Sequence, residues 1–333
     1  MTTPEPPPRP KVSVIICVLN GERFVRPICE YTKRQTFRDI EVLLVVSDNS
    51  EDRTLEVAKE MASEMERATV LLYRDVGMLG GSKNHGMEHA RGEYLWFLDV
   101  DDEPSLHYLE ELVSLADSTG ADIVGCNFIY SEVRRPFEED DRECETCVMT
   151  GLEAAKLRAV ERYPVPSWSM LYSADMVREN GIVFEEGICE DISFTYKSLL
   201  SARKVCFDSK PLYMYMITPG SVCNDSVNRD RRGLAELKRY DDLEEYIKGM
   251  PDEAFFRRRF ALLRLRSSGH LSFRTFARYA CSDEQRDMLR RTGGAMVLLE
   301  GMLHRMLPPV YYAMIRVWLS EVFYRSGRAY APV

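Results

Sequence analysis

The strongest constraint on the fold is an alternation of short apolar runs with segments of helical periodicity. The apolar runs cover residues 11–20, 39–46, 69–73, 94–98 and 121–130, and helices are expected to about Thr36, from about Asp52, and over 82–91 and 104–118. Strands and helices that alternate in this way predict an α/β fold, a parallel sheet with helices on both faces. Ligands of such sheets bind outside the carboxyl ends of the strands.

The fourth apolar run ends in a dense group of carboxylates. Tyr94–Leu98 has the composition of a strand buried on both faces, and Asp99, Asp101 and Asp102 follow it. Asp99 and Asp101 are two residues apart, so on an extended chain they would project to the same side and repel each other unless a cation lies between them. Oxygen ligands favour Mg2+ or Mn2+. The alternative is an acidic turn that caps the helix expected from Pro104.

Two further strand ends carry polar side chains. Asn20 is the last residue of the first apolar run and Asp48 follows the second, so both should reach the same edge of the sheet as Asp99 and Asp101. The net charge of −9 argues against a general nucleic-acid binder. The same negative charge opposes an anionic substrate, and a locally bound metal ion could offset it.

The cysteines and the N-terminal residues indicate a cytoplasmic protein. The nine cysteines are odd in number and irregularly spaced, which does not match a disulfide framework. A single pair, Cys144-x-x-Cys147, is a weak zinc signal, and His85 is expected to be structural. Residues 1–10 are rich in proline and have no apolar core, so we expect a disordered tail and no signal peptide.

The character of the chain changes at about residue 226. Residues 11–225 are expected to form the α/β domain, and residues 226–333 a helical region with arginine-rich faces. Charged residues and Pro308-Pro309 interrupt its most apolar part, Met296–Tyr324, which falls short of the ~20 apolar residues of a membrane span. Its helices should pack on the α/β domain or on a second subunit, and interfacial contact with a membrane is the alternative.

The order and spacing of the motifs resemble the family 2 glycosyltransferases of the GT-A fold, with a Rossmann-like sheet. The resemblance is greatest to bacterial enzymes that assemble capsular polysaccharide, exopolysaccharide and lipopolysaccharide chains, and it covers about residues 11–223. Each motif is loose by itself, and their order is specific. The matching segments are Asn20-Gly21-Glu22, Val45 to Thr54, Gly80 to Gly86, Gly92 to Asp102, Trp168 to Tyr172, Asn180-Gly181-Ile182, Glu190 to Phe194 and Pro211 to Tyr215.

The resemblance implies a role for each matching residue. Asp48 corresponds to the aspartate that binds the uracil of a UDP-sugar, and Asp99-Val100-Asp101 to the DxD motif, with Asp101 the surest metal ligand. Asp191 corresponds to the catalytic base, and Glu190 would orient it or bind the acceptor. The residues expected to contact the nucleotide-sugar are Cys17, Leu19, Asn20, Glu22, Asp48, Ser50, Gly80, Lys83, Asn84, Asp99 and Val100.

Four positions depart from the family pattern. Cys17 and Leu19 stand where the family usually has proline and tyrosine, and Ser47 replaces the first of two aspartates. Lys83 stands where arginine is commoner, which keeps the charge and loses the planar fork. These differences concern the contacts with the nucleotide more than the chemistry.

The implied reaction moves a sugar from a UDP-sugar to a hydroxyl of a growing glycan or a lipid-linked acceptor. A metal ion neutralises the leaving diphosphate, and a carboxylate removes the proton of the hydroxyl, which contributes ~10²–10⁴-fold. One direct displacement through an oxocarbenium-like state inverts the anomeric carbon. Asp191 could instead cap the helix expected from Ile192, and Trp168 could stack on an acceptor sugar or be buried.

Two other functions stay open on the sequence alone. A sugar nucleotidylyltransferase would need a glycine-rich, basic segment where this chain has Leu19-Asn20-Gly21-Glu22. A degenerate transferase domain could serve as a scaffold or regulatory subunit, which Leu19 and Ser47 favour and the retained Asp99, Asp101 and Asp191 oppose. The chain has neither a GxxxxGK[ST] loop nor a GxGxxG motif after a strand.

Overall fold

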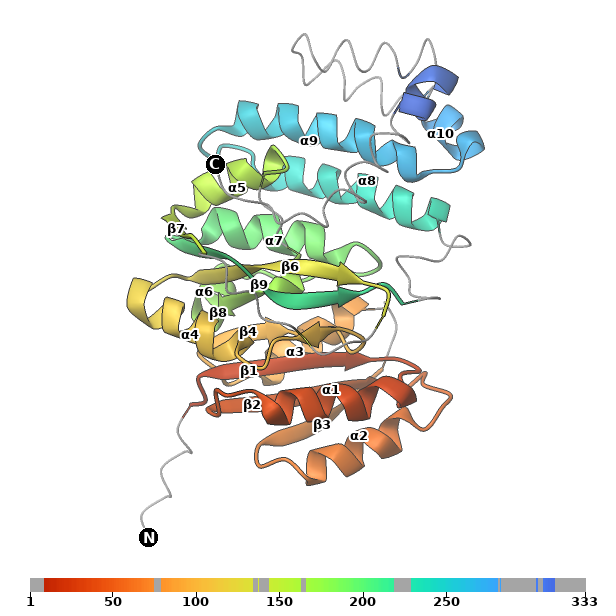
Figure 1. Ribbon diagram of the computed structural model, residues 1–333. Coiled ribbons are helices and arrows are strands. Elements are labelled where there is room, and N and C mark those ends of the chain that lie inside the picture. Colours follow the sequence, from red (N-terminus) through yellow and green to blue (C-terminus); the bar gives the residue numbers. More distant parts are fainter. Residues whose placement is uncertain are drawn as a thin grey trace.

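One mixed sheet organises the molecule, and its strand order is β3-β2-β1-β4-β8-β6-β9-β5, with β7 paired to β9 (Figure 1). The computed structural model describes residues 9–74, 79–133, 137, 144–162, 166–218, 229–280, 282, 304 and 308–314. The strands are β1 Val12–Val18, β2 Ile40–Ser47, β3 Ala68–Tyr73, β4 Tyr94–Phe97, β5 Glu103–Pro104, β6 Ile123–Ser131, β7 Thr146–Met149, β8 Met170–Ser173 and β9 Val205–Met216.

The helices alternate with these strands and then continue without them. They are α1 Glu22–Arg34, α2 Thr54–Ser63, α3 Leu79–His89, α4 Tyr108–Thr119, α5 Gly151–Ala159, α6 Ala174–Glu179, α7 Glu190–Ser201, α8 Arg229–Tyr246, α9 Glu253–Ser267 and α10 Phe273–Ala280. Within the described residues, none of these helices combines the length and the apolar character that a membrane span requires.

The sheet is mostly parallel, as the sequence predicts. Strands β3, β2, β1 and β4 are parallel neighbours, and β6 and β9 form a second parallel pair. Strand β8 runs antiparallel between β4 and β6, and β5 and β7 run antiparallel to β9. The carboxyl ends of β1, β2 and β4 therefore lie at one edge of the sheet, where the sequence places its candidate site.

Side chains of each central strand enter two separate cores, one on each face of the sheet. On β1, Val12, Val14, Ile16 and Val18 pack with helices α1, α2 and α4. Ile15 points to the opposite core, which α3 and α5 to α9 complete. This burial on both faces explains why the central strands read as continuous apolar runs.

Several element boundaries differ from those expected. Helix α3 begins at Leu79, so Gly80 and Gly81 lie in its first turn and not in a loop. Glu103-Pro104 pairs with β9 as β5, which delays the next helix to Tyr108. The two strands expected at 205–207 and 211–217 form a single strand, β9. Its pairing with β6 changes register on both sides of Asn127, which accommodates the extra residues of β9.

Helices α8 and α9 share a core with the helices that precede them. Tyr240, Leu243 and Phe260 are buried in the same cluster as Phe194 and Tyr196 of α7. The rings of Tyr196 and Phe260 meet edge to face, with 5.0 Å between their centroids. In Figure 1, α8 and α9 lie beyond α7, toward the end of the molecule opposite α2. Helices α8 and α9 therefore pack on α7.

Three predictions concern segments that lie largely outside the described residues. Of the apolar stretch Met296–Tyr324, only His304 and residues 308–314 are described. Of the acidic loop Arg134–Glu145, only Phe137, Cys144 and Glu145 are described. Of the N-terminal tail, residues 1–8 are not described.

Candidate active site

The carboxylates after β4 lie in a turn and differ in their surroundings. Strand β4 ends at Phe97, so the alternation of an extended chain does not apply to Asp99 and Asp101, contrary to the expectation from their spacing. The side chain of Asp99 is 27% exposed, whereas Asp102 is buried. Asp102 accepts hydrogen bonds from the Tyr213 hydroxyl and the Met216 amide of β9, both at 2.8 Å. Asp102 therefore anchors the turn, which leaves Asp99 and Asp101 as the candidate metal ligands.

Lys83 connects this turn to the start of α7. Its Nζ lies 2.9 Å from Glu190 Oε1 and 4.0 Å from Asp99 Oδ1. The ammonium group also lies 5.1 Å from the centroid of the Phe184 ring. Both Lys83 and Glu190 are buried. One buried cation thus brings together carboxylates that are far apart in the sequence.

The electrostatic balance of this cluster is negative. Burial lowers the pKa of Lys83, but the charges of Glu190, Asp99 and Asp191 outweigh burial, so its pKa is raised and the ammonium stays protonated. Burial raises the pKa of Asp99 to about 7; Lys83 opposes this shift, and Asp101 adds to it. The single positive charge of Lys83 does not balance the carboxylates around it, so the cluster keeps a net negative charge. Mg2+ and Mn2+ prefer oxygen ligands such as these carboxylates. Asp99 and Asp101 therefore fit a divalent cation.

Asp191 lies in the first turn of α7, directly after Glu190. A helix N-terminus by itself favours the ionised carboxylate and would lower the pKa of Asp191. Instead, burial and then the charge of Glu190 raise it, although Lys83 and Arg158 oppose the shift. The carboxylate of Asp191 is therefore more basic than an exposed aspartate.

The loop that leads to Glu190 is held from two sides. The Asn84 side chain of α3 donates a hydrogen bond to the Phe184 carbonyl and accepts one from the Phe184 amide, both at 2.8 Å. From α8, the buried Arg239 donates to the carbonyls of Glu186 and Ile188. Sequence reasoning missed Arg239, because nothing in an amphipathic helix marks which arginine turns inward.

The loops after β1 and β2 interlock through their polar groups. The Asn20 side chain accepts a hydrogen bond from the Glu51 amide at 2.8 Å, and the Asn20 amide donates to Ser50 Oγ at 3.3 Å. Glu22 accepts from the Arg53 amide at 3.2 Å. These contacts hold the two strand ends together, with Asp48 exposed beside them.

Four more predicted contact residues have distinct surroundings. Leu19 is 52% exposed at the end of β1. Cys17 is near the charges of Lys83, Asp99 and Glu190, and burial raises the pKa of its thiol to about 12, so the thiol stays neutral. Gly80 packs directly against the chain at Glu185. Val100 lies in the acidic turn itself.

Trp168 is buried in an aromatic stack beneath the acidic turn. Its ring lies 4.4 Å from the Tyr213 ring and 5.3 Å from the Tyr215 ring, measured between centroids. Tyr213 in turn donates its hydroxyl hydrogen bond to Asp102. With 7% of its surface exposed, Trp168 supports the site from below, and a contact with the acceptor stays a prediction.

The architecture corresponds to the GT-A fold of known glycosyltransferases. A solved structure of TarS residues 1–349 from S. aureus in complex with UDP-GlcNAc aligns with a TM-score of 0.67 and 19% identity, covering 96% of this chain and 93% of that chain. The mannosyltransferase PcManGT from Pyrobaculum calidifontis, in complex with GDP-Man and Mn2+, aligns with a TM-score of 0.53 and 14% identity, covering 92% and 90%. At these identities the likeness shows the fold alone.

The sequence comparisons name the family. Residues 13–170 match the family model described as glycosyl transferase family 2. The uncharacterized glycosyltransferase EpsJ of Bacillus subtilis is 30% identical over 218 residues, which is 64% of this chain and 63% of that protein. Over residues 13–170 the chain therefore resembles glycosyl transferase family 2, and it spans less than two thirds of the length of EpsJ. These comparisons support the family that the motifs predict, and the solved structures confirm the predicted fold.

Proposed function

We propose that this chain is an inverting, metal-dependent glycosyltransferase that moves a sugar from a UDP-sugar to a hydroxyl of a growing glycan or lipid-linked acceptor in surface polysaccharide synthesis. The observation that carries the proposal is the position of Lys83. Its ammonium lies between Asp99, after β4, and Glu190, at the start of α7. The turn after β4 and the start of α7, which carries the candidate base Asp191, are therefore held around the same buried lysine, and a direct displacement requires such proximity.

Asp99 and Asp101 would hold the divalent cation, Mg2+ or Mn2+. When bound, the cation supplies Lewis-acid stabilisation of the departing diphosphate. Lys83 limits the repulsion among the surrounding carboxylates, so that an anionic donor meets a less negative site. The mannosyltransferase PcManGT, solved in complex with GDP-Man and Mn2+, supports this assignment by analogy.

Asp191 would act as the general base. Its raised pKa makes it a stronger proton acceptor than an exposed aspartate, and it accepts the proton of the attacking hydroxyl. Glu190 is held by Lys83 at 2.9 Å and would position the neighbouring Asp191 or bind the acceptor. Because the base and the leaving diphosphate lie on opposite sides of the sugar in a single displacement, the product has an inverted anomeric centre.

The donor is assigned as a UDP-sugar, with Asp48 binding the uracil. The TarS structure holds UDP-GlcNAc, and Asp48 lies beside the interlocked loops at the same edge of the sheet as Asp99. The proposal includes a cytoplasmic location, peripheral to the membrane where the acceptor is lipid-linked.

Nucleotide binding tests the proposal directly. UDP, GDP and their sugar conjugates should be titrated calorimetrically with and without Mn2+, and thermal unfolding should be followed in parallel. UDP should bind in a metal-dependent way, and Asp101→Asn should weaken binding about tenfold or more. Asp117→Asn, on the exposed side of α4, is the matched control. Failure of every nucleotide to bind would favour the scaffold function, and preference for GDP would remove the role of Asp48.

A further inference from the structure

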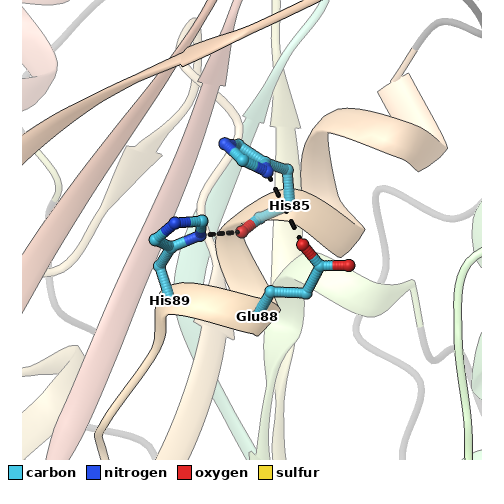
Figure 2. A group of neighbouring side chains, drawn as sticks. All are labelled: His85, Glu88 and His89. Carbon is cyan, nitrogen blue, oxygen red and sulfur yellow. Dashed lines mark hydrogen bonds and ion pairs between the residues drawn. The ribbon is translucent and has the colours of Figure 1, made fainter.

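Three side chains of types that can bind a metal lie close together on α3. They are on a part of this helix that the proposed reaction does not use. His85, Glu88 and His89 are spaced so that they share one side of the helix (Figure 2). One ligand atom from each lies within 4.8 Å of the others. His85, which the sequence predicts to be structural, thus has a second histidine and a carboxylate beside it.

The tautomer of His89 is set by its surroundings. Its Nδ1 lies 2.9 Å from the carbonyl oxygen of His85. Because a carbonyl oxygen can only accept, Nδ1 carries the hydrogen, and the neutral ring keeps its lone pair on Nε2. Metal-binding histidines commonly make this kind of hydrogen bond, which orients the ring and fixes the coordinating nitrogen.

His85 is oriented by its neighbours. Its ring contacts those of Tyr73 and His89, at centroid distances of 5.4 Å and 4.5 Å. Its Nδ1 is 3.7 Å from Glu88 Oε2. The Glu88 side chain is 73% exposed and can rotate toward a shared ligand without disturbing the core.

We propose that His85, Glu88 and His89 form a binding site for a transition-metal dication of the zinc class. Two imidazoles and one carboxylate select Zn2+, Co2+ or Ni2+ over Mg2+. Ligand bonds of about 2.0–2.2 Å require the side chains to draw together from their present positions, and water completes the coordination. This site is chemically distinct from Asp99 and Asp101, which offer oxygen ligands alone.

A metal ion at this site would pin the last turn of α3. The same helix carries Lys83 and Asn84 on its earlier turns, where they contact Glu190 and Phe184. A ligand that binds only the folded state raises the unfolding midpoint by mass action. Zn2+ should therefore raise the unfolding temperature of the protein, whether or not the proposed transferase activity is found.

Cobalt absorption tests the assignment on the full chain. Co2+ should be titrated in excess Mg2+, which occupies the carboxylate site, and one equivalent should bind without a thiolate charge-transfer band. His85→Gln and His89→Gln should each weaken Co2+ binding about tenfold or more, as the loss of a ligand predicts. The matched control is His107→Gln. His107, at the N-cap of α4, and Glu110 form a similar pair at 3.0 Å, but Glu111 takes the place of the second histidine.

The outcomes separate cleanly. Equal Co2+ affinity in the wild type and both histidine variants would overturn the proposal, and so would an equal loss in His107→Gln. A thiolate band would place the metal on cysteine ligands, such as Cys144 and Cys147, and would also overturn the proposal. Unfolding temperatures in the presence of a chelator report whether the variants are folded. Glu88→Gln, which changes only an exposed side chain, repeats the test if a histidine variant is unstable.

Discussion

At the residue scale, Lys83 contributes most to the arrangement of the site. It is a buried ammonium group, protonated because the carboxylates around it outweigh the cost of burial. Removing one partner of a buried ion pair leaves the other charge unpaired, which is more costly than replacing both. The site is therefore sensitive to single changes and more tolerant of paired ones.

Replacing Lys83 by methionine should lower the free energy of unfolding by about 3–5 kcal/mol, because Glu190 then keeps a buried, uncompensated charge. Adding Glu190→Gln should restore part of that loss. Urea unfolding at neutral pH measures both. The exposed Lys59 of α2 provides the control, Lys59→Met, which should change little. A Lys83→Met protein as stable as the wild type would show that the pair does not form.

Glu41 should make the fold sensitive to acid. Burial raises its pKa, but hydrogen bonds from Ser13 and from the backbone and side chain of Arg91 outweigh burial, so its pKa is lowered. A lowered pKa in the folded state contributes stability above the unfolded value of about 4.3, and that stability is lost as the pH falls through the folded pKa.

Glu41→Gln should therefore lower the free energy of unfolding at pH 7. Below about pH 4.3, the free energy of unfolding of this variant should decrease less steeply with falling pH than that of the wild type. Unfolding curves across this range, with the exposed Glu60→Gln as control, measure the difference. A wild type and a Glu41→Gln protein whose stabilities fall in parallel would contradict the assignment.

At the scale of the element, the first turn of α3 depends on close backbone approach. A Cβ on Gly80 would lie 2.1 Å from the carbonyl oxygen of Glu185 and 3.3 Å from Glu190 Cβ. Helix α3 therefore packs against the loop before α7 only because this position has no side chain. The same contact aligns Lys83 with Glu190.

Gly80→Ala should push α3 away from that loop and reduce turnover about 10–100-fold, since small misplacements of reacting groups are costly. Steady-state kinetics with the donor identified by binding measures this. Leu79→Ala, which shortens a 39% exposed neighbour, should leave kcat close to that of the wild type. Unchanged turnover in Gly80→Ala would show that the spacing between α3 and the loop is not critical.

At the scale of the whole molecule, α8 and α9 complete the core on one face of the sheet. Leu243→Ala should cost about 2–5 kcal/mol, as for other buried leucines, and Leu234→Ala on the exposed side of α8 should cost little. In a Trp318→Phe background, fluorescence then reports Trp96 and Trp168 of the α/β part. Leu243→Ala should shift the unfolding transition followed by this fluorescence and the transition followed by far-UV circular dichroism to the same extent. A shift in the circular-dichroism transition alone would mean that the C-terminal helices unfold separately from the α/β part.

Much of this organisation could be predicted from the sequence because it follows from local pattern. Apolar runs locate the central strands, and the carboxyl ends of parallel strands locate Asn20, Asp48 and Asp99 at one edge. The pairing of Lys83 with Glu190 joins residues 107 positions apart and has no local signal. The raised pKa of Asp191 could not be predicted either, because it depends on burial that only the tertiary packing creates.

The most direct test of the proposed mechanism separates donor binding from turnover in Asp191→Asn. Release of UDP from the tightest-binding UDP-sugar in the presence of Mn2+ and acceptor measures turnover, and calorimetry measures donor affinity. We predict that Asp191→Asn binds the donor about as tightly as the wild type but turns over ~10²–10⁴-fold more slowly, as expected for loss of a general base. Turnover within a few-fold of the wild type would contradict the assignment of Asp191 and, with it, the proposed site.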